Sequence, residues 1–490
     1  MRLRPSALVA TERARERLLA LLVALAAAAG AALGNVADRV TPIAAAARPG
    51  RYIERAVYCP PKVTGRGVEQ RVGVSARGDL RATVAIEPTS RDPVALPGSA
   101  VLVDVVDERS ALDVVGIGAP VSGAVTMSVA PPARGPSKSA GGAGAGNCSP
   151  VASPSWFFAS GSSELTADQR LLLYNPFPDE AVVRISFFTP TGERSKANLA
   201  DVAVPAGKWR EIRVNDYILS QPLLATSIEA NRGRIVAWRS ITSTPESGPR
   251  GVGLTLGSPA PGTAWYFPEG GVGPGVRERL AVLNPGGEEA RVSVSLSTSS
   301  RTVQPRRLVE VAVPPRSTAE IDLGTEVAGG SSDTVKMGAA VISTNGVPVV
   351  AERELVYSGS VEGISTEVGA RGGALGWLMG PILAQPDDDW VAILNPGERS
   401  ARVSLALQGG GGPVPAPARL DDLRVGAGLR IEVALPRAGG PVTAVVVSDQ
   451  PVVAERASYG GGGGPDRRFG RGRPADVAGL MGVPCRPNGP

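Results

Sequence analysis

The chain has no histidine among its 490 residues, so it lacks the side chain most often used for acid–base catalysis and metal binding. Ser-His-Asp and Cys-His nucleophile pairs and His-ligated zinc sites are therefore excluded. A hydrolase would have to use carboxylates or a Ser-Lys pair. Ser137-Lys138 and Ser195-Lys196 are adjacent pairs in polar loops and lack the Ser-x-x-Lys spacing of such a site.

Two further polar or glycine-rich stretches are poor matches to a ligand site. Asp387-Asp388-Asp389 lacks the spacing of a calcium loop and is interpreted as a solvated turn. The run 271–275 is glycine-rich, but Pro274 and the strand expected after it exclude a phosphate loop. We predict no catalytic, cofactor-binding or metal-binding residue, no cofactor, and a protein that is not an enzyme.

An arginine recurs at one position, as Arg239, Arg353 and Arg456. The second and third follow Glu in the strand PVVAER, whereas Trp238 precedes the first. Adjacent strand residues face opposite sides, so Glu and Arg of one strand cannot pair with each other. We predict that each Arg binds backbone carbonyls or a carboxylate within its own domain. Catalysis here would need an acid in every copy, which the first copy lacks.

These arginines belong to a repeat that is most visible as Asn-Pro, at Asn175, Asn284 and Asn395, about 110 residues apart. Each pair lies between two alternating apolar runs and predicts a strand, a tight turn and a second strand. The Asn side chain is expected to bond backbone two residues on. Gly286 and Gly397 would supply the positive φ of a type II turn.

A tryptophan opens each repeat, at Trp156, Trp265 and Trp377. We expect these side chains to plug one end of a sandwich core. The alternative is an exposed aromatic platform for sugar rings, which the aromatic runs 156–158 and 265–267 keep open.

The whole pattern predicts an all-β protein of tandem immunoglobulin-like (Ig-like) β-sandwich modules after one N-terminal transmembrane helix. A propeller with two four-stranded blades per repeat would fit the same length. The predicted divisions are a cytoplasmic N-terminus (1–17), a transmembrane signal-anchor (18–37), a linker (38–50), an N-terminal β domain with a Gly/Pro-rich linker (51–147), three repeats (148–250, 255–362 and 370–460) and a disordered basic tail (461–490).

The prediction of an N-terminal anchor depends on five arginines before residue 18 and on the uninterrupted apolar run that starts there. This length and polarity predict a single-pass membrane anchor with the N-terminus in the cytoplasm and the bulk of the chain outside it. A cleaved signal peptide is the alternative, because small residues follow at 44–47.

Three cysteines without metal-like spacing agree with export. We favour a Cys59–Cys148 disulfide, which leaves Cys485 without a pairing partner; three unpaired cysteines are the alternative. The formal charge of +5 is small for this length and gives no broad basic face, so nucleic acid is not an expected partner. Abundant Ala, Gly, Pro and Arg indicate a GC-rich genome, which suggests an actinomycete.

Taken together, the Trp-aromatic-Phe, Leu-x-Asn-Pro and Pro-Val-Val-Ala-Glu-Arg phrases resemble the actinobacterial family called domain of unknown function 5719. The resemblance includes the Tyr58-Cys59-Pro60 start and the stretch from Cys148 to Trp156. It implies no activity and no catalytic residue. We therefore expect a non-catalytic cell-envelope scaffold or protein-interaction module whose partner is an envelope protein. Binding of a cell-wall glycan is the alternative, and a carboxylate-based enzyme is a remote one.

Overall fold

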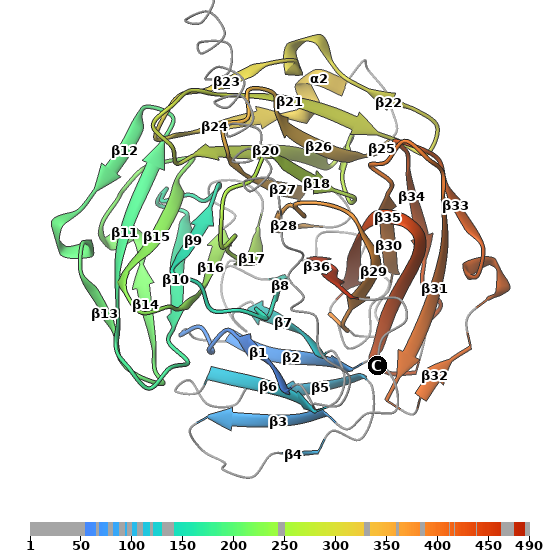
Figure 1. The fold of residues 1–490 in the computed structure, drawn as a ribbon, viewed down its shortest axis with the longest axis horizontal. Helices are drawn as coiled ribbons and strands as arrows, with labels where there is room; N and C mark the ends of the chain where they lie inside the picture. Colours follow the sequence, from blue (N-terminus) through green and yellow to red (C-terminus); the bar gives the residue numbers. More distant parts are fainter. Residues whose placement is uncertain are drawn as a thin grey trace, which may run out of the picture. The chain divides into compact units, whose positions relative to one another are not determined.

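The computed structural model describes residues 54–64, 68–76, 82–87, 94–95, 100–104, 111–117, 121–129, 142–243, 250–327, 334–358, 362–382, 388–410, 412–415, 417–437, 439–461 and 475–485. These residues are nearly all β (Figure 1). No helix in them is long and apolar enough to cross a membrane. The predicted anchor, 18–37, lies outside the described residues.

Four copies of one two-sheet unit make up this part of the chain. In each copy, one sheet contains the first strand and the other contains the last long strand. We call them the first-strand sheet and the last-strand sheet. In the N-terminal copy the first-strand sheet is β1 (Glu54–Cys59), β6 (Ala111–Ile117), β3 (Ala82–Glu87) and β4 (Val94–Ala95); the last-strand sheet is β5 (Ala100–Asp104), β2 (Val68–Ala76), β7 (Val121–Val129) and β8 (Gly142–Asn147).

The next two copies, repeat 1 and repeat 2, have the same order of strands. In repeat 1 the first-strand sheet is β9 (Ser155–Phe158), β15 (Ala225–Arg232), β11 (Ala181–Thr189) and β12 (Gly192–Ser195), and β13 (Val202–Val204) also pairs with β11. Its last-strand sheet is β14 (Trp209–Arg213), β10 (Ala167–Tyr174), β16 (Val236–Ser243) and β17 (Gly251–Leu256). In repeat 2 the first-strand sheet is β18 (Ala264–Phe267), β26 (Gly338–Ser343), β21 (Ala290–Ser297) and β22 (Thr302–Val303), and β23 (Val311–Val313) also pairs with β21. Its last-strand sheet is β24 (Ser317–Asp322), β20 (Val276–Asn284), β27 (Val350–Ser358) and β28 (Glu362–Val368). Repeat 2 adds the pair β19 (Gly271–Val272) and β25 (Val335–Lys336) and the short helix α2 (Leu323–Val327).

Repeat 3 differs in one respect, because one long strand, β35 (Val442–Gly461), serves both of its sheets. Its first-strand sheet contains β29 (Ala374–Met379), β31 (Ala401–Gly409), β32 (Gly412–Val414), β33 (Leu423–Val425) and β37 (Val483–Pro484); its last-strand sheet contains β34 (Arg430–Ala434), β30 (Asp388–Leu394) and β36 (Ala475–Met481). Strand β31 shows why these segments form half-buried strands: Val403, Leu405 and Leu407 are buried and alternate with exposed neighbours.

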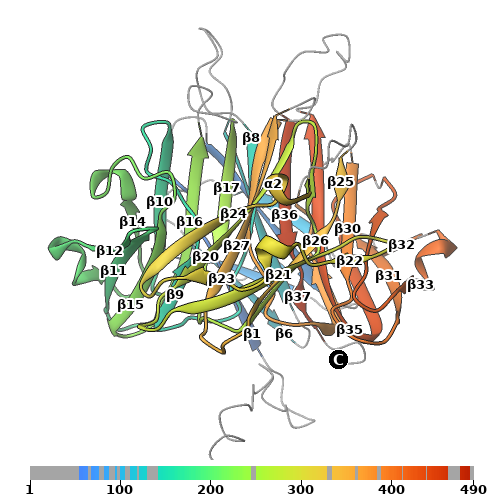
Figure 2. The same ribbon diagram turned by 90° about the horizontal axis from the view of Figure 1, so that it is seen from above.

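The four last strands, β8, β17, β28 and β36, contact one another at the centre of the four copies (Figure 1). Figure 2 shows β8, β17 and β36 running alongside one another. Glycine permits this close approach: a Cβ added to Gly251 on β17 would lie 2.5 Å from the backbone N of Ile364 on β28.

This centre corrects two predictions. The Gly/Pro-rich linker predicted at the end of the N-terminal domain, roughly residues 131–146, includes residues 142–146, but these form most of β8, whose residues are all buried. Residues 475–485 were assigned to a disordered tail, but they contain β36 and β37. Residues 142–146 are rich in glycine, and glycine serves close packing there rather than mobility. The strands β17, β28 and β36 also extend each repeat beyond its predicted end.

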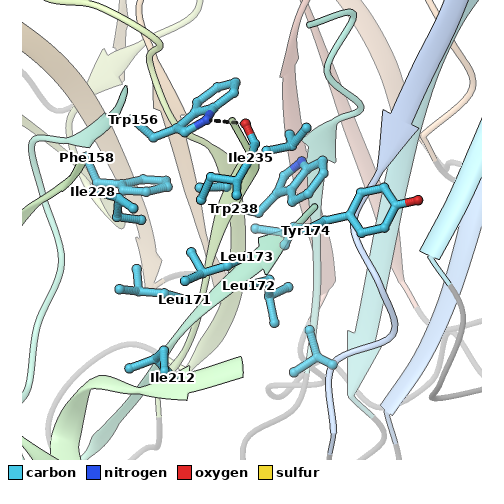
Figure 3. Close-up of a cluster of buried hydrophobic side chains, with 14 of the residues drawn as sticks. Trp156, Phe158, Leu171, Leu172, Leu173, Tyr174, Ile212, Ile228, Ile235 and Trp238 are labelled. Carbon is cyan, nitrogen blue, oxygen red and sulfur yellow. Dashed lines mark hydrogen bonds between the residues drawn. The ribbon is translucent and has the colours of Figure 1, made fainter. Parts of the chain in front are cut away.

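The hydrophobic cores are shared between neighbouring copies. One cluster joins Val72 and Met127 of the N-terminal copy to Trp156, Leu172 and Trp238 of repeat 1 (Figure 3). A second cluster joins repeat 1 to repeat 2, and a third joins Tyr266 of repeat 2 to repeat 3. The described residues from 54 onward therefore form one compact unit rather than a row of independent domains.

Repeat 3 also contacts the N-terminal copy. Ala124 and Ala145 share a small buried cluster with Ile382 and Leu480. Beside them, the Asn147 side chain donates to the Met481 carbonyl oxygen, 2.9 Å away. The first and last copies are thus held together although 334 residues separate these two positions.

Candidate functional site

The side chains of the repeated asparagines form hydrogen bonds to backbone groups at the ends of strands. In repeat 2, Asn284 accepts a hydrogen bond from the Gly286 N–H at 3.0 Å, as expected for a side chain that bonds backbone two residues on. It also donates to the carbonyl oxygens of Glu288 (2.7 Å) and Val313 (3.0 Å). Asn175 and Asn395 make the same three kinds of bond, and all three side chains are fully buried.

The expected type II turn is wrong, because neither Gly286 nor Gly397 has a positive φ. A left-handed residue common to the three repeats lies instead in the turn between β13 and β14 and in the two equivalent turns, at Gly207, Arg316 and Gly428. In repeat 2 the Arg316 N–H donates to the Gly286 carbonyl oxygen, so the two turns pack on each other.

The three repeat-opening tryptophans are buried core residues. The indole N–H of Trp156 donates to the Ile235 carbonyl oxygen at 2.8 Å (Figure 3). Trp265 and Trp377 donate in the same way to Val349 and Val452. At 0–1% exposure they cannot stack on a sugar, so the platform hypothesis is wrong at these positions.

The recurring arginines connect one repeat to the next. Arg239 of repeat 1 donates from Nη1 to Glu352 Oε2 of repeat 2 at 3.1 Å, and its Nη2 pairs with Glu352 Oε1. The same carboxylate accepts the backbone N–H groups of Ala159 (3.1 Å) and Ser160 (3.0 Å), while Arg239 donates to the Ser160 carbonyl oxygen. We call this arrangement the first clamp.

The second clamp repeats these contacts between repeat 2 and repeat 3. Arg353 binds Glu455 through both nitrogens of its fork, at 2.9 and 2.6 Å. Glu455 accepts the Glu269 N–H at 3.1 Å, and Arg353 donates to the Glu269 carbonyl oxygen at 2.5 Å. In both clamps the Arg and Glu side chains are completely buried.

Arg456, in the last repeat that the structure describes, pairs with Asp389 of its own repeat. The prediction of an own-domain carboxylate is therefore correct for Arg456 and wrong for Arg239 and Arg353. The predicted carbonyl contacts are present at all three. Trp238 replaces Glu in repeat 1 and donates its N–H to the Asn147 carbonyl oxygen of the N-terminal copy at 2.8 Å.

Asp389 was missed, because the acidic run 387–389 was interpreted as a solvated turn. A signal was present: Asp389 precedes Asn395 by the same six residues that separate Glu278 from Asn284 and Gln169 from Asn175. In repeat 3 this side chain pairs with Arg456, and in repeat 2 the charge of Arg353 acts on Glu278.

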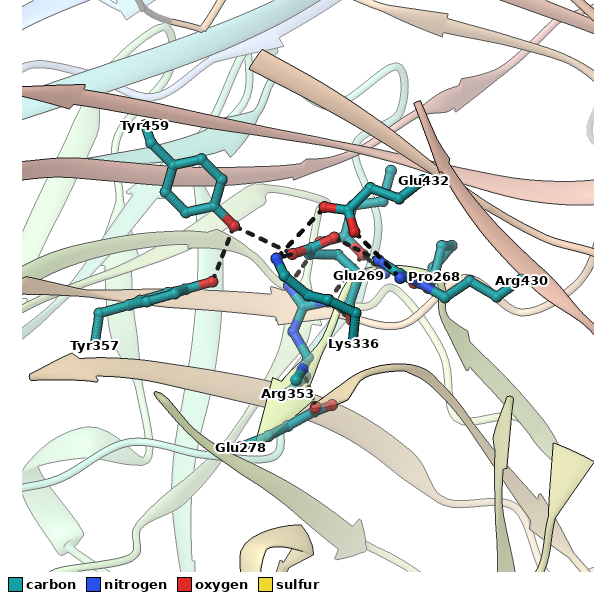
Figure 4. Close-up of polar contacts among 11 residues, drawn as sticks. Pro268, Glu269, Glu278, Lys336, Arg353, Tyr357, Arg430, Glu432 and Tyr459 are labelled. Carbon is teal, nitrogen blue, oxygen red and sulfur yellow. Dashed lines mark hydrogen bonds and ion pairs between the residues drawn. The ribbon is translucent and has the colours of Figure 1, made fainter. Parts of the chain in front are cut away.

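Around the second clamp the charged residues form a larger network, drawn in Figure 4. Glu269 Oε2 lies 3.0 Å from Arg430 Nη2, and Glu269 Oε1 accepts from the Tyr459 hydroxyl at 3.2 Å. Lys336 Nζ lies 3.7 Å from Glu269. The Tyr357 and Tyr459 hydroxyls lie 3.1 Å apart. Glu269 therefore joins cations from β25 and β34 to the clamp.

Glu278 lies in this network without an ion-pair contact of its own. Its Oε2 accepts the Gly271 N–H at 2.8 Å, whereas its Oε1 is buried without a hydrogen-bond partner. Burial raises the pKa of Glu278 to about 8; Arg353 opposes the rise, and Glu269 and Glu455 add to it. Burial likewise raises the pKa of Tyr357 and of Tyr459.

The network contains the groups of an acid–base pair, and their side chains are buried. Glu269, Glu278 and Glu455 are each exposed by 1% or less. A general acid or base must reach the reacting atom directly or through one water. In the described residues no group of three His, Cys, Asp or Glu side chains could hold a metal ion. What this arrangement does chemically is fix one repeat to the next.

The cysteines lie at two separate places. Cys59 and Cys148 form a disulfide, both fully buried, which fastens β1 to the residue after β8. Cys485 is partly buried beside β29.

Comparisons with known proteins give a family without an activity. The chain belongs to the family of unknown function DUF5719, which it matches over residues 118–374, just over half of its length. No protein with a curated description matches it.

Two solved structures have only a slight similarity to the chain. The crystal structure of Thermotoga maritima 1070 is 22% identical over 22% of this chain and 94% of that one, with a TM-score of 0.20. The α-L-rhamnosidase of Streptomyces avermitilis, complexed with L-rhamnose, is 12% identical over 83% of this chain and 57% of that one, with a TM-score of 0.12. At these scores neither supports a fold or a function.

Proposed function

We propose that the chain is a non-catalytic scaffold of the cell envelope, anchored in the membrane by residues 18–37, that presents residues 54–485 outside the cytoplasm to an envelope protein. One observation supports this proposal above others: the repeated polar residues are buried in contacts that hold the fold together. The clamps use Arg239 and Arg353, and Arg456 pairs with Asp389. The Ig-like assignment of the repeats belongs to the same proposal and is supported only by their paired antiparallel sheets.

The disulfide supports the extracytoplasmic location, because disulfides persist in oxidising compartments and are rare in the cytosol. A reporter fused after residue 50 tests the location directly. Activity of an export-dependent reporter is expected, and activity only of a cytoplasmic reporter would refute the orientation.

An apolar contact point for a protein partner is available on repeat 1. The side chains of Leu165 and Leu219 are the two most exposed among the large apolar residues that the structure describes, at 92% and 63%. Their loops are joined by backbone bonds from Ser163 to Gln221 and from Ser220 to Ser163. The two leucines therefore belong to one surface, which we take as the partner contact.

Photo-crosslinking tests this contact in envelope membranes that contain the full chain. A photoreactive residue at position 165 or 219 should give a discrete adduct with a protein. The matched control is position 303, another exposed apolar site, in repeat 2. With the photoreactive residue at position 165, the adduct should weaken in Leu219→Ser; with it at position 219, the adduct should weaken in Leu165→Ser. Equal labelling from position 303, or no adduct from either leucine, would refute the proposed surface.

A further inference from the structure

A polar pocket of ≈ 280 Å³ lies between repeat 1 and repeat 2, beside the first clamp. Repeat 1 contributes the loop around Ser160 and the end of β16, and repeat 2 contributes β20, β24, β27 and Ile364 of β28. Glu352, whose carboxylate is held by Arg239, forms part of its wall. The volume is near the lower limit for small-molecule sites, about 300 Å³, so it suits a ligand of one ring.

The pocket is hollow because repeat 1 has small side chains where repeat 2 has large ones. Ser160 stands four residues after Trp156, and Glu269 stands four residues after Trp265. Ser243 stands four residues after Arg239, and Tyr357 stands four residues after Arg353. At the second clamp Glu269 binds Arg430, and Tyr357 contacts Tyr459. Protein side chains thus fill the space there that repeat 1 leaves open.

The charges of the wall disfavour an anion. Four carboxylates (Glu164, Glu320, Glu352 and Glu354) and two arginines (Arg277 and Arg279) line the pocket, a formal charge of 2 − 4 = −2. Arg239 neutralises Glu352, which leaves −1. A ligand that is neutral or positively charged is therefore favoured over a carboxylate or phosphate.

The carboxylates of the wall have free acceptor oxygens, and the buried Nε of Arg279 is a donor without a partner. Glu320 and Glu354 each bind Arg279 through one oxygen, and their other oxygens have no partner among the described residues. The Glu164 carboxylate has none in that part of the chain either. Such a wall requires a ligand that donates hydrogen bonds, through hydroxyl or ammonium groups.

The lining also includes apolar side chains, from Pro222, Leu223, Ile241 and Ile364. A molecule with C–H faces and several hydroxyl groups satisfies both the polar and the apolar lining residues of this pocket. We propose that it binds a single sugar ring, neutral or amino-substituted. This site is separate from the tryptophan platforms excluded above and does not depend on the scaffold proposal.

Saturation-transfer NMR on the full chain tests the site, with glucose, galactose, mannose, N-acetylglucosamine and glucosamine as probes and glucuronate as the anionic comparator. At least one probe should bind, and glucuronate should bind more weakly than glucose. Ser243→Tyr, which copies Tyr357 of repeat 2, should weaken binding at least tenfold. Ser300→Tyr, an exposed serine remote from the pocket, is the matched control and should leave it unchanged.

Three results would overturn the proposal: no probe binding to the native chain, equal binding to Ser243→Tyr, or glucuronate binding as tightly as glucose. Should Ser243→Tyr fail to fold, as judged by its urea midpoint, Glu164→Gln decides instead. That side chain has no partner to lose, so the fold should be kept and probe affinity should fall about threefold. Unchanged affinity in Glu164→Gln would then overturn the site.

Discussion

Arg239 and Glu352 form a completely buried ion pair although they belong to different repeats and lie 113 residues apart in the sequence. Each is held further by backbone groups of repeat 1, so neither charge is buried without hydrogen bonds. A buried charge that loses its partner is strongly destabilising. These two side chains therefore make the stability of repeat 1 and that of repeat 2 depend on each other.

Arg239→Met should lower the free energy of unfolding by about 3–5 kcal/mol, because Glu352 would stay buried without its counter-ion. Urea unfolding of the full chain measures this. The matched control is Arg232→Met, which removes the exposed pair with Glu180 and should cost below about 1 kcal/mol. Equal effects of the two variants would contradict the role given to the clamp.

Combining Arg239→Met with Glu352→Leu should be less harmful than the sum of the two single changes, since neither charge is then left alone. A double-mutant cycle gives the coupling energy. Simple additivity would mean that the two side chains act independently.

Glu278→Gln should remove part of the pH dependence of stability. With a folded pKa of about 8 against a usual 4.5, folded Glu278 keeps a proton that the unfolded chain releases. Stability therefore falls as pH rises from about 4.5 to about 8, by on the order of 5 kcal/mol at most. Gln occupies the equivalent position in repeat 1, at Gln169, and should fit.

The measurement is the difference in urea midpoint between native chain and variant across pH 4–9. The variant should gain relative stability as pH rises, whereas Glu288→Gln, at an exposed site, should show no such trend. A constant difference across this range would mean that Glu278 titrates normally.

Asn284→Asp should destabilise more than Asn284→Ala. Alanine leaves the carbonyl oxygens of Glu288 and Val313 without their donor, at about 1–3 kcal/mol. Aspartate adds an acceptor facing those same oxygens. Thermal unfolding compares them, with Asn231→Ala, an exposed side chain that also donates to backbone, as the control. The reverse ranking would show that Asn284 acts only through the turn.

Deleting residues 475–490 should reduce the cooperativity of unfolding, because β36 pairs with β35 and carries the buried Leu480 and Met481. Deleting only 486–490 is the matched control and should leave the unfolding curve unchanged. Identical curves for both deletions would restore the original interpretation of this segment as a disordered tail.

The sequence alone was sufficient for the properties that depend on local pattern. Alternation of apolar residues predicted the strands and the all-β class, and the spacing of Asn284 from its two equivalents counted the repeats. The preference of Asn for bonding backbone two residues on predicted that contact correctly. These features require only neighbouring residues, so they can be inferred without knowing how the chain closes.

Only the tertiary structure decided which residues meet across repeats. Arg239 was assigned a partner in its own domain because no local rule connects it to Glu352. The segment 142–146 was interpreted as a linker because glycine composition cannot distinguish a mobile chain from one packed against another backbone. Both outcomes depend on how four similar units pack around their last strands, and contacts between distant segments leave no periodic signal in a single sequence.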